Sequence, residues 1–211
     1  MKVQSFTFNS FQENSYVIYD ESKECIIFDP GCSNSLEEKA LQEFIESTDL
    51  TPVRLINTHC HIDHILGNQF ISQKYDLPLE AHAGEVPVLE SGKMVSQTYG
   101  IPYTESPPIA KYIEEGDEIS FGQSTLKSLF TPGHSPASLS FHHADSKILI
   151  AGDVLFYGSI GRTDLPGGSF DTLIRSIKEQ FFILPDDTVV YSGHGQSTTI
   201  GFEKANNPFL Q

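Results

Sequence analysis

The fold is decided by the stretch Thr58-His59-Cys60-His61-Ile62-Asp63-His64, which places three imidazoles and one carboxylate within six consecutive positions. Residues 53–57 before it are apolar and partly β-branched, which predicts a strand, and residues 67–71 after it favour a helix. The cluster is therefore expected on a tight loop at the C-terminal end of a strand, where α/β proteins place ligand sites. Neutral imidazole and carboxylate bind first-row divalent metals, so the stretch predicts a metal site.

Three later segments carry further candidate ligands. His134 lies in TPGHS, Asp153 lies in AGDV and His194 lies in SGHG. Each follows an apolar run, so each is expected at a strand end beside a glycine that lets backbone approach closely. One divalent ion takes about four protein ligands at most. The candidates exceed that number and suit two ions sharing a carboxylate; they are His59, His61, Asp63, His64, His134, Asp153 and His194.

Composition limits the function classes. A chain of 211 residues is expected to form one domain, with a core large enough to need no disulfides or other staples. The net charge of −15 argues against nucleic acid and against an anionic membrane as partners. Three cysteines do not indicate a disulfide framework. The N-terminus lacks an apolar signal core and no run approaches a membrane span, so a cytoplasmic protein acting on a small molecule is expected. The oligomeric state is left open.

H-x-H-x-D-H, followed in order by TPGHS, AGD and SGHG, resembles the metallo-β-lactamase superfamily over nearly the whole chain. Within it, GRTDLPGGS and GHGQSTTIGFEKANNPFL resemble the small glyoxalase II-like (hydroxyacylglutathione hydrolase-like) hydrolases. The resemblance implies an α/β fold, a four-layer αβ/βα sandwich with metals at one edge between two sheets. It also implies a single domain over residues 1–211, without the C-terminal helical domain of the longer glyoxalase II enzymes.

The resemblance assigns roles to the candidate ligands. Asp153 is expected to bridge two divalent metal ions, with zinc the first expectation and iron or manganese as alternatives. Asp63 is in addition the expected catalytic residue, which orients a metal-bound hydroxide. Cys60 matches a variable position of the family and is not expected to bind metal. The first ion would be held by His59, His61 and His134, and the second by Asp63, His64 and His194.

The implied reaction is thioester hydrolysis, on substrates like S-lactoylglutathione. Two ions sharing a water would lower its pKa from ~15.7 to near 7, which supplies hydroxide at neutral pH. The alternative is a persulfide dioxygenase with one iron on His59, His134 and Asp153. A β-lactamase is less favoured, because its common dizinc forms have Cys in place of Asp153. A non-catalytic metal-binding protein is the remaining class.

Two residues are candidates for substrate binding, Arg162 and Tyr103. Arg162 matches a Lys that contacts glutathione in the longer enzymes, but Asp164 stands where their Tyr would be, which leaves the thiol open. Arg162 either clamps an anionic group or pairs with Asp164 and only fastens the loop. Residues 94–108 are expected as a long loop, in which Tyr99 and Tyr103 either line a cleft or cover the core.

Local patterns predict the remaining elements. Asp29, before Pro30-Gly31, is expected to fasten a turn through backbone hydrogen bonds, and His82 is expected to be structural. His142 and His143 are expected to be solvated. Helices are expected at 35–47 with Ser35 as N-cap, at 67–75, at 85–91 and at 170–182 with Phe170 facing inward. Strands are expected at 3–8, 16–19, 25–28, 79–82, 125–130, 138–141, 148–150 and 189–191.

Overall fold

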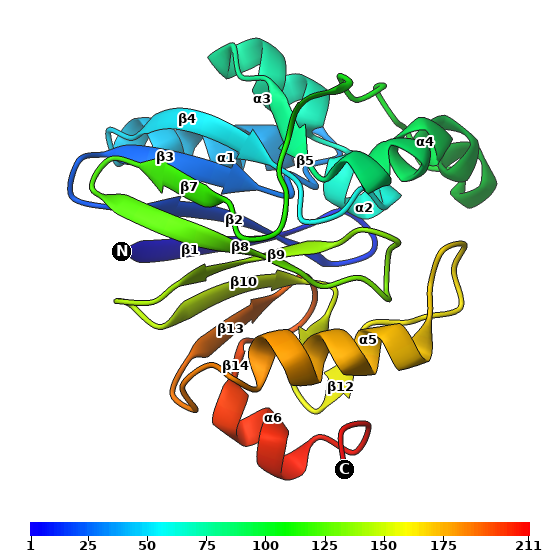
Figure 1. Cartoon of the computed structure of the whole chain (residues 1–211). Helices are drawn as coiled ribbons and strands as arrows, with labels where there is room; N and C mark the ends of the chain where they lie inside the picture. The colour runs from blue at the N-terminus through cyan, green and yellow to red at the C-terminus, as the bar shows by residue number, and fades with distance from the viewer. The chain divides into compact units, whose positions relative to one another are not determined.

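The computed structural model describes residues 1–211 and divides into two compact units (Figure 1). Unit 1 comprises Met1–Tyr112 and Ser120–Ser124, and unit 2 comprises Ile113–Ile119 and Thr125–Gln211. Unit 1 contains one six-stranded sheet, and a second six-stranded sheet lies mainly in unit 2. The prediction of a single domain over residues 1–211 stays a prediction.

The sheet of unit 1 has the strand order β1-β2-β3-β4-β5-β6. β1 to β3 are antiparallel neighbours, whereas β3, β4, β5 and β6 run parallel. The carboxyl ends of β3 and β4 therefore lie at the same edge of the sheet, where the loops after them can meet. The strands are β1 (Lys2–Phe8), β2 (Glu13–Tyr19), β3 (Glu24–Phe28), β4 (Thr51–Ile56), β5 (Leu79–Ala81) and β6 (Ile109–Tyr112).

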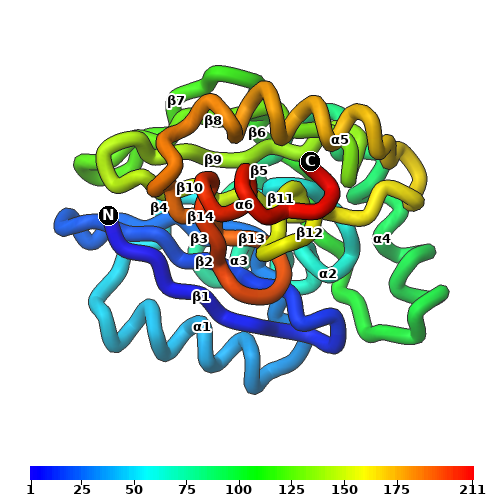
Figure 2. The backbone as a smooth tube through the Cα atoms, turned by 90° about the horizontal axis from the view of Figure 1, so that it is seen from below, coloured from blue at the N-terminus to red at the C-terminus, as the bar shows by residue number.

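Helices cover this sheet because their apolar residues recur on one face. α1 (Ser35–Ser47) buries Leu41 and Ile45, and its Phe44 meets the ring of Phe6 in β1, as the course of α1 along β1 shows (Figure 2). The side chain of Asn34, and not Ser35 as predicted, caps this helix. The other helices of unit 1 are α2 (Ile62–Ile65), α3 (Asn68–Tyr75), η1 (Ala83–Glu85) and α4 (Val86–Tyr99).

The second sheet has the order β14-β13-β10-β9-β8-β7. β10 pairs parallel to β13 and antiparallel to β9. Its first helix, α5 (Phe170–Ser176), continues directly into the π-helical turn η2 (Ile177–Phe181). Its second helix is α6 (Ile200–Asn206). The strands are β7 (Glu118–Phe121), β8 (Ser124–Phe130), β9 (Leu139–His143), β10 (Ile148–Gly152), β13 (Val189–Ser192) and β14 (Thr198–Thr199), with a separate hairpin of β11 (Leu155–Phe156) and β12 (Ser159–Ile160).

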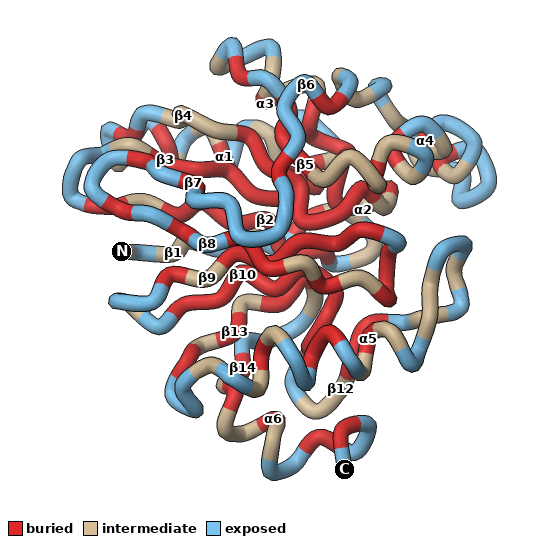
Figure 3. Tube along the Cα trace, viewed as in Figure 1, coloured by how far each residue is buried: buried red, intermediate tan, exposed pale blue.

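Each unit has its own apolar core, formed by the buried strands and the inner helix faces (Figure 3). In unit 1, Ile27 and Leu55 on the parallel strands are fully buried. In unit 2, Leu173, Ile177 and Phe181 form the inner face of α5 and η2. None of the helices combines the length and the apolar character that a membrane crossing needs.

Three local predictions are corrected. α4 runs to Tyr99, so the loop predicted from residue 94 begins only after it, because Gly100 ends the helix in a left-handed conformation (φ 66°). Phe170 is 48% exposed and does not face inward, since it is the first residue of α5. The β9–β10 turn buries His143, and His142 is only partly exposed, so neither is a fully solvated histidine.

Candidate metal centre

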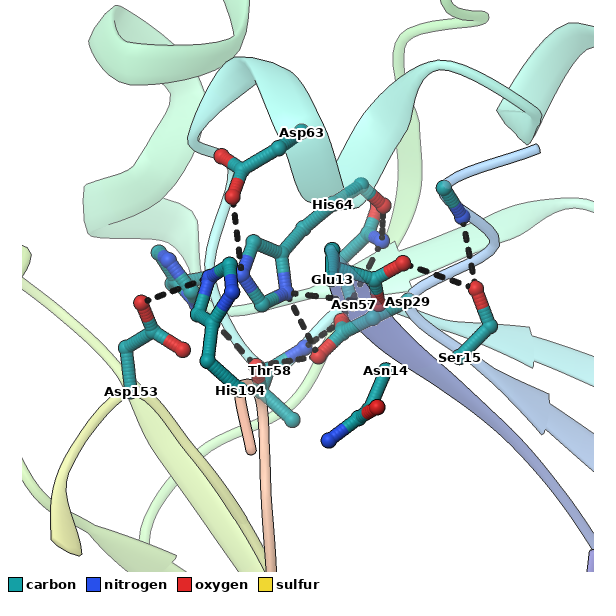
Figure 4. A network of polar contacts seen from close by, with 12 residues as sticks. Glu13, Asn14, Ser15, Asp29, Asn57, Thr58, Asp63, His64, Asp153 and His194 are labelled. Carbon is teal, nitrogen blue, oxygen red and sulfur yellow. Dashed lines mark hydrogen bonds and ion pairs between the residues drawn. The ribbon is translucent and has the colours of Figure 1, made fainter. Parts of the chain in front are cut away.

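Unit 1 brings its four predicted ligands together on the loop after β4 and on the short helix α2. The ring centroid of His59 lies 4.8 Å from that of His61 and 4.1 Å from that of His64. His64 Nε2 and Asp63 Oδ2 are 3.7 Å apart, and the two side chains point toward each other (Figure 4). His59 and His64 are fully buried, whereas His61 and Asp63 are partly exposed. The loop thus has two buried candidate metal ligands, His59 and His64, and two partly exposed ones, His61 and Asp63.

Asp29, at the end of β3, holds this loop. Its Oδ1 accepts the backbone N–H of Thr58 at 2.7 Å, and its Oδ2 accepts the Thr58 hydroxyl at 2.6 Å. Because the Thr58 proton points to Asp29, the Thr58 oxygen is an acceptor for His59 Nδ1, which lies 3.1 Å away. This network assigns the Nδ1–H tautomer to His59 and leaves the lone pair of Nε2 for a metal ion.

Asp29 orients a second ligand as well. Its Oδ2 lies 3.2 Å from His64 Nδ1, so the carboxylate faces one nitrogen and leaves His64 Nε2 facing Asp63. Asn57 Nδ2 donates to the His64 carbonyl at 3.0 Å and so fixes the backbone of α2. Asp29 accepts a backbone N–H as predicted, but that N–H belongs to Thr58 in the loop after β4 and not to its own turn, and the contact with His64 was not foreseen. A carboxylate behind a ligand histidine fixes both the tautomer and the orientation of the ring.

Glu13, on β2, is a fully buried carboxyl beside the same histidine. Its Oε1 lies 3.9 Å from His64 Nδ1, and its Oε2 accepts the Ser15 hydroxyl at 2.9 Å. Burial raises the pKa of Glu13 well above its usual range. Glu13 was not predicted as a site residue, because its neighbours Asn14 and Ser15 are also polar and the sequence gives no sign that this end of β2 is buried.

Unit 2 gathers its three predicted ligands around one carboxylate oxygen. His134 follows β8, Asp153 follows β10 and His194 follows β13. His134 Nε2 and His194 Nε2 each lie 3.4 Å from Asp153 Oδ2 (Figure 4 shows the Asp153–His194 contact). His134 Nδ1 lies 2.7 Å from the Arg162 carbonyl oxygen, so Nδ1 donates to it and Nε2 is directed at Asp153.

These separations fit metal ligands better than hydrogen bonds. An N–H···O hydrogen bond is normally ~2.9–3.0 Å long. Two ligands bound tetrahedrally at about 2.0–2.1 Å lie roughly 3.3–3.4 Å apart. The two 3.4 Å distances at Asp153 Oδ2 match the separation of metal ligands. The atoms concerned are imidazole nitrogens and a carboxylate oxygen, which divalent transition metals bind. The residues present therefore fit a divalent metal ion.

The predicted substrate-binding residues lie outside these clusters. Arg162 Nε and Nη2 donate to the two oxygens of Asp164, each at 2.7 Å, and this hydrogen bonding lowers the pKa of Asp164 to about 2. The Tyr103 side chain packs against the unit 1 core, and its hydroxyl oxygen accepts the Ser106 N–H at 3.0 Å. Arg162 thus makes the predicted pair with Asp164, and Tyr103 covers the core, which was one of its two predicted roles. A role of either residue in substrate binding stays a prediction.

One cysteine and two histidines outside the predicted ligand set have structural roles. Cys60 is buried, its thiol pKa is raised well above the usual range by that burial, and its N–H donates to Glu85. His82 Nδ1 accepts the Gly84 N–H at 3.0 Å, which confirms its structural role. His143 Nδ1 accepts the Ser146 N–H at 3.1 Å and holds the β9–β10 turn. The prediction that His143 is solvated is wrong, because its ring is buried and accepts a hydrogen bond from the backbone of the turn.

A comparison with family descriptions matches residues 9–194 to the metallo-beta-lactamase superfamily. The chain belongs to the metallo-β-lactamase superfamily. Among its relatives, the probable metallo-hydrolase YqgX of Bacillus subtilis is 39% identical over 100% of this chain and 98% of its own length. The hydroxyacylglutathione hydrolase GloC of Haemophilus influenzae is 34% identical with the same coverage.

Solved structures of the superfamily agree with the fold. BLEG-1, a B3 metallo-beta-lactamase, superposes with a TM-score of 0.91 at 37% identity, over 100% of both chains. TTHA1623 in a di-iron-bound form gives 0.88 at 33% identity, over 98% of this chain and 100% of its own. ETHE1 from Myxococcus xanthus gives 0.78 at 27% identity, over 99% and 84%. The predicted α/β class and metallo-β-lactamase fold are confirmed.

Proposed function

We propose that the chain is a metal-dependent thioesterase that hydrolyses substrates like S-lactoylglutathione. The observation that carries the proposal is the convergence of His134 Nε2 and His194 Nε2 on one oxygen of Asp153, each at 3.4 Å. The relation to the GloC hydroxyacylglutathione hydrolase, over the full chain, supports a thioester as the substrate class. Thiolate is a good leaving group, so such a reaction needs little help from a general acid.

The ligand assignment is part of the proposal. Asp153 is shared by two divalent ions, for which zinc, iron and manganese are all candidates, and the di-iron form of TTHA1623 supports a binuclear site. The arrangement of the donors within each unit supports the use of all seven ligands. One ion is assigned to His59, His61 and His134, and the other to Asp63, His64 and His194.

The residues of the chain would supply orientation. Divalent ions at this site would lower the pKa of a coordinated water from about 15.7 to about 7. Asp63, partly exposed and 3.7 Å from His64, is placed to orient that water toward a substrate carbonyl. Asp29 and Thr58 keep the imidazoles of His59 and His64 in one tautomer. Cys60 is not the nucleophile, because its thiol is buried and its pKa is raised.

The proposal is tested with purified protein stripped by a chelator and reloaded with zinc, iron or manganese. We expect S-lactoylglutathione hydrolysis to disappear on stripping and to return on reloading. Asp63→Asn should lower the turnover by at least ~100-fold, since it affects both a ligand and the reacting water. Asp145→Asn, at an exposed position in the β9–β10 turn, is the matched control and should leave turnover unchanged. Full turnover after stripping would refute the proposal.

The second candidate is a persulfide dioxygenase with one iron on His59, His134 and Asp153. The likeness to ETHE1 is the finding that favours it. The same preparations distinguish the two candidates. Consumption of one oxygen molecule per glutathione persulfide by the iron-loaded protein, without thioester turnover, would replace the thioesterase by the dioxygenase.

A further inference from the structure

A buried carboxylate outside the ligand set joins several segments of unit 2. Glu203 lies on α6 and is fully buried. Both of its oxygens accept the backbone N–H of Gly158, each at 3.1 Å. Oε1 also accepts the hydroxyl of Thr198, and Oε2 accepts Asn207 Nδ2 at 2.7 Å. Both oxygens thus accept from two donors, which a glutamine amide could not reproduce because one of its ends is itself a donor.

The first of these segments is the β11–β12 hairpin, which begins just after Asp153. Gly158 is at its tip and adopts a φ of +64°. At the other end, a Cβ on Gly161 would lie 1.9 Å from the Asp153 carbonyl oxygen, so the hairpin returns directly onto the backbone of Asp153. The next residue, Arg162, provides the carbonyl that orients His134. The position of the hairpin therefore affects both Asp153 and His134.

The second segment follows the third ligand. Thr198 begins β14, four positions after His194, and its hydroxyl donates to Glu203. Asn207 strengthens the connection, because its Nδ2 donates both to Glu203 and to the Ser159 carbonyl of the hairpin at 3.0 Å. The stacking of Tyr157 on Phe202, with centroids 4.7 Å apart, holds the hairpin tip on α6 as well.

We propose that Glu203 is a positioning residue of the metal centre. It fastens the hairpin after Asp153 to the segment after His194, and so fixes the relative positions of His134, Asp153 and His194. The inference rests on the proposed use of these three residues as metal ligands, but it does not depend on the substrate. A buried carboxylate that accepts from the hairpin and from both ends of its own β14–α6 segment is suited to this task, since each charge-assisted hydrogen bond is stronger than a neutral one.

The test is a cobalt(II) titration of metal-free protein, followed by the visible spectrum, which reports ligand geometry. We expect Glu203→Gln to weaken cobalt binding by ~10-fold or more and to alter the spectrum, as changes behind metal ligands commonly do. Asn207→Ala should act in the same direction with a smaller effect. Hydrogen exchange in the metal-free protein should be faster at residues 155–161 in both variants.

Thr199→Ala is the matched control. The Thr199 hydroxyl caps α6 by accepting the Phe202 N–H at 3.2 Å, so its loss destabilises the same helix without removing a hydrogen bond to the hairpin. It should lower the melting temperature and keep cobalt affinity within about twofold of wild type. Equal losses of cobalt affinity in Thr199→Ala and Glu203→Gln would overturn the proposal, as would unchanged cobalt binding in Glu203→Gln. If the wild-type protein does not hydrolyse thioesters, the proposed function is refuted, but the comparison of cobalt binding among the variants still tests the role of Glu203.

Discussion

At the scale of single residues, the orientation of the ligands depends on hydrogen bonds to their second nitrogens. His59 Nδ1 is held by Thr58, His64 Nδ1 faces Asp29, and His134 Nδ1 donates to the Arg162 carbonyl. In each of these rings Nδ1 is therefore oriented by an oxygen atom of the chain, and Nε2 is the nitrogen that can bind a metal ion. Ordered partners of this kind raise the affinity of a metal site, because the ligands need no rearrangement on binding.

The first prediction concerns Asp29. Asp29→Asn replaces an oxygen that accepts from Thr58 or faces His64 by an amide donor, so zinc affinity should fall by ~10–100-fold while the fold is kept. The measurement is competition with a chromophoric chelator. Asp49→Asn is the matched control, since Asp49 shares the left-handed backbone conformation of Asp29 (φ 58° and 46°) and Asn tolerates it. Equal affinities in the two variants would contradict the role given to Asp29.

A second prediction concerns Arg162, whose two contacts have different chemistry. Its carbonyl holds His134, whereas its guanidinium pairs with Asp164. Arg162→Ala should therefore keep the metal content, and it should raise the KM for an anionic thioester by ~10-fold, since a charge-assisted hydrogen bond contributes about 1.5–3 kcal/mol. The KM for a neutral thioester should not change. Asp164→Asn frees the guanidinium and should not raise either KM. Equal losses on charged and neutral substrates would assign Arg162 to the loop alone.

At the scale of elements, much of the site could be predicted because strand ends are visible in the sequence. The apolar runs before His134, Asp153 and His194 correspond to β8, β10 and β13, and each ligand follows its strand. Buried polar partners were harder to predict. Glu13 faces His64 and Glu203 accepts from Gly158, both distant in the sequence, and no local pattern distinguishes such a residue from a solvated one.

Helix ends were also difficult to predict from local propensity. α4 continues past residue 91 because Leu89, Gly92 and Ser96 keep a buried face toward the core. Gly92 lets Tyr103 approach the helix closely, since a Cβ would lie 3.1 Å from the tyrosine hydroxyl oxygen. The helix and the segment after it are thus defined by tertiary packing, and a turn-like composition of residues 94–108 indicated a longer loop than is present.

A third prediction concerns the junction at Asp20, which fastens the β7–β8 turn to the end of β2. Burial alone would raise its pKa, but hydrogen bonds from Ser22, Gln123 and Ser124 outweigh this and lower the pKa from 3.8 to about 2. The folded state therefore binds the proton more weakly than the unfolded state. The resulting stabilisation, about 2 kcal/mol, is present above pH 3.8 and is lost as the pH falls toward 2.

Asp20→Asn should remove this pH dependence. Urea unfolding of the metal-free protein at pH 7 should show a loss of up to about 2 kcal/mol, and the difference from wild type should shrink as the pH falls from 4 to 2. Glu21→Gln, at the neighbouring exposed position, should follow wild type at every pH. A constant difference between Asp20→Asn and wild type over this range would contradict the assignment.

At the scale of the whole molecule, the net charge of −15 favours cation binding. A ligand that binds only the folded state stabilises it by about 2.7 kcal/mol at a hundred times its dissociation constant. For a chain of this size, we predict that zinc raises the melting temperature by roughly 5–10 °C, with a larger shift at higher free zinc. Magnesium, which prefers oxygen ligands, is the control and should have little effect. A zinc shift no larger than that with magnesium would contradict a site built from imidazoles.

The central claim, a thioesterase that needs two metal ions, is tested most directly by measuring the initial rate of S-lactoylglutathione hydrolysis while metal is added to the stripped protein. We predict that the rate rises until about two equivalents of zinc per chain are bound and then stays constant, because the seven ligands suit two ions that share Asp153. A rate that reaches its maximum at one equivalent, or no hydrolysis at any metal content, would contradict the account.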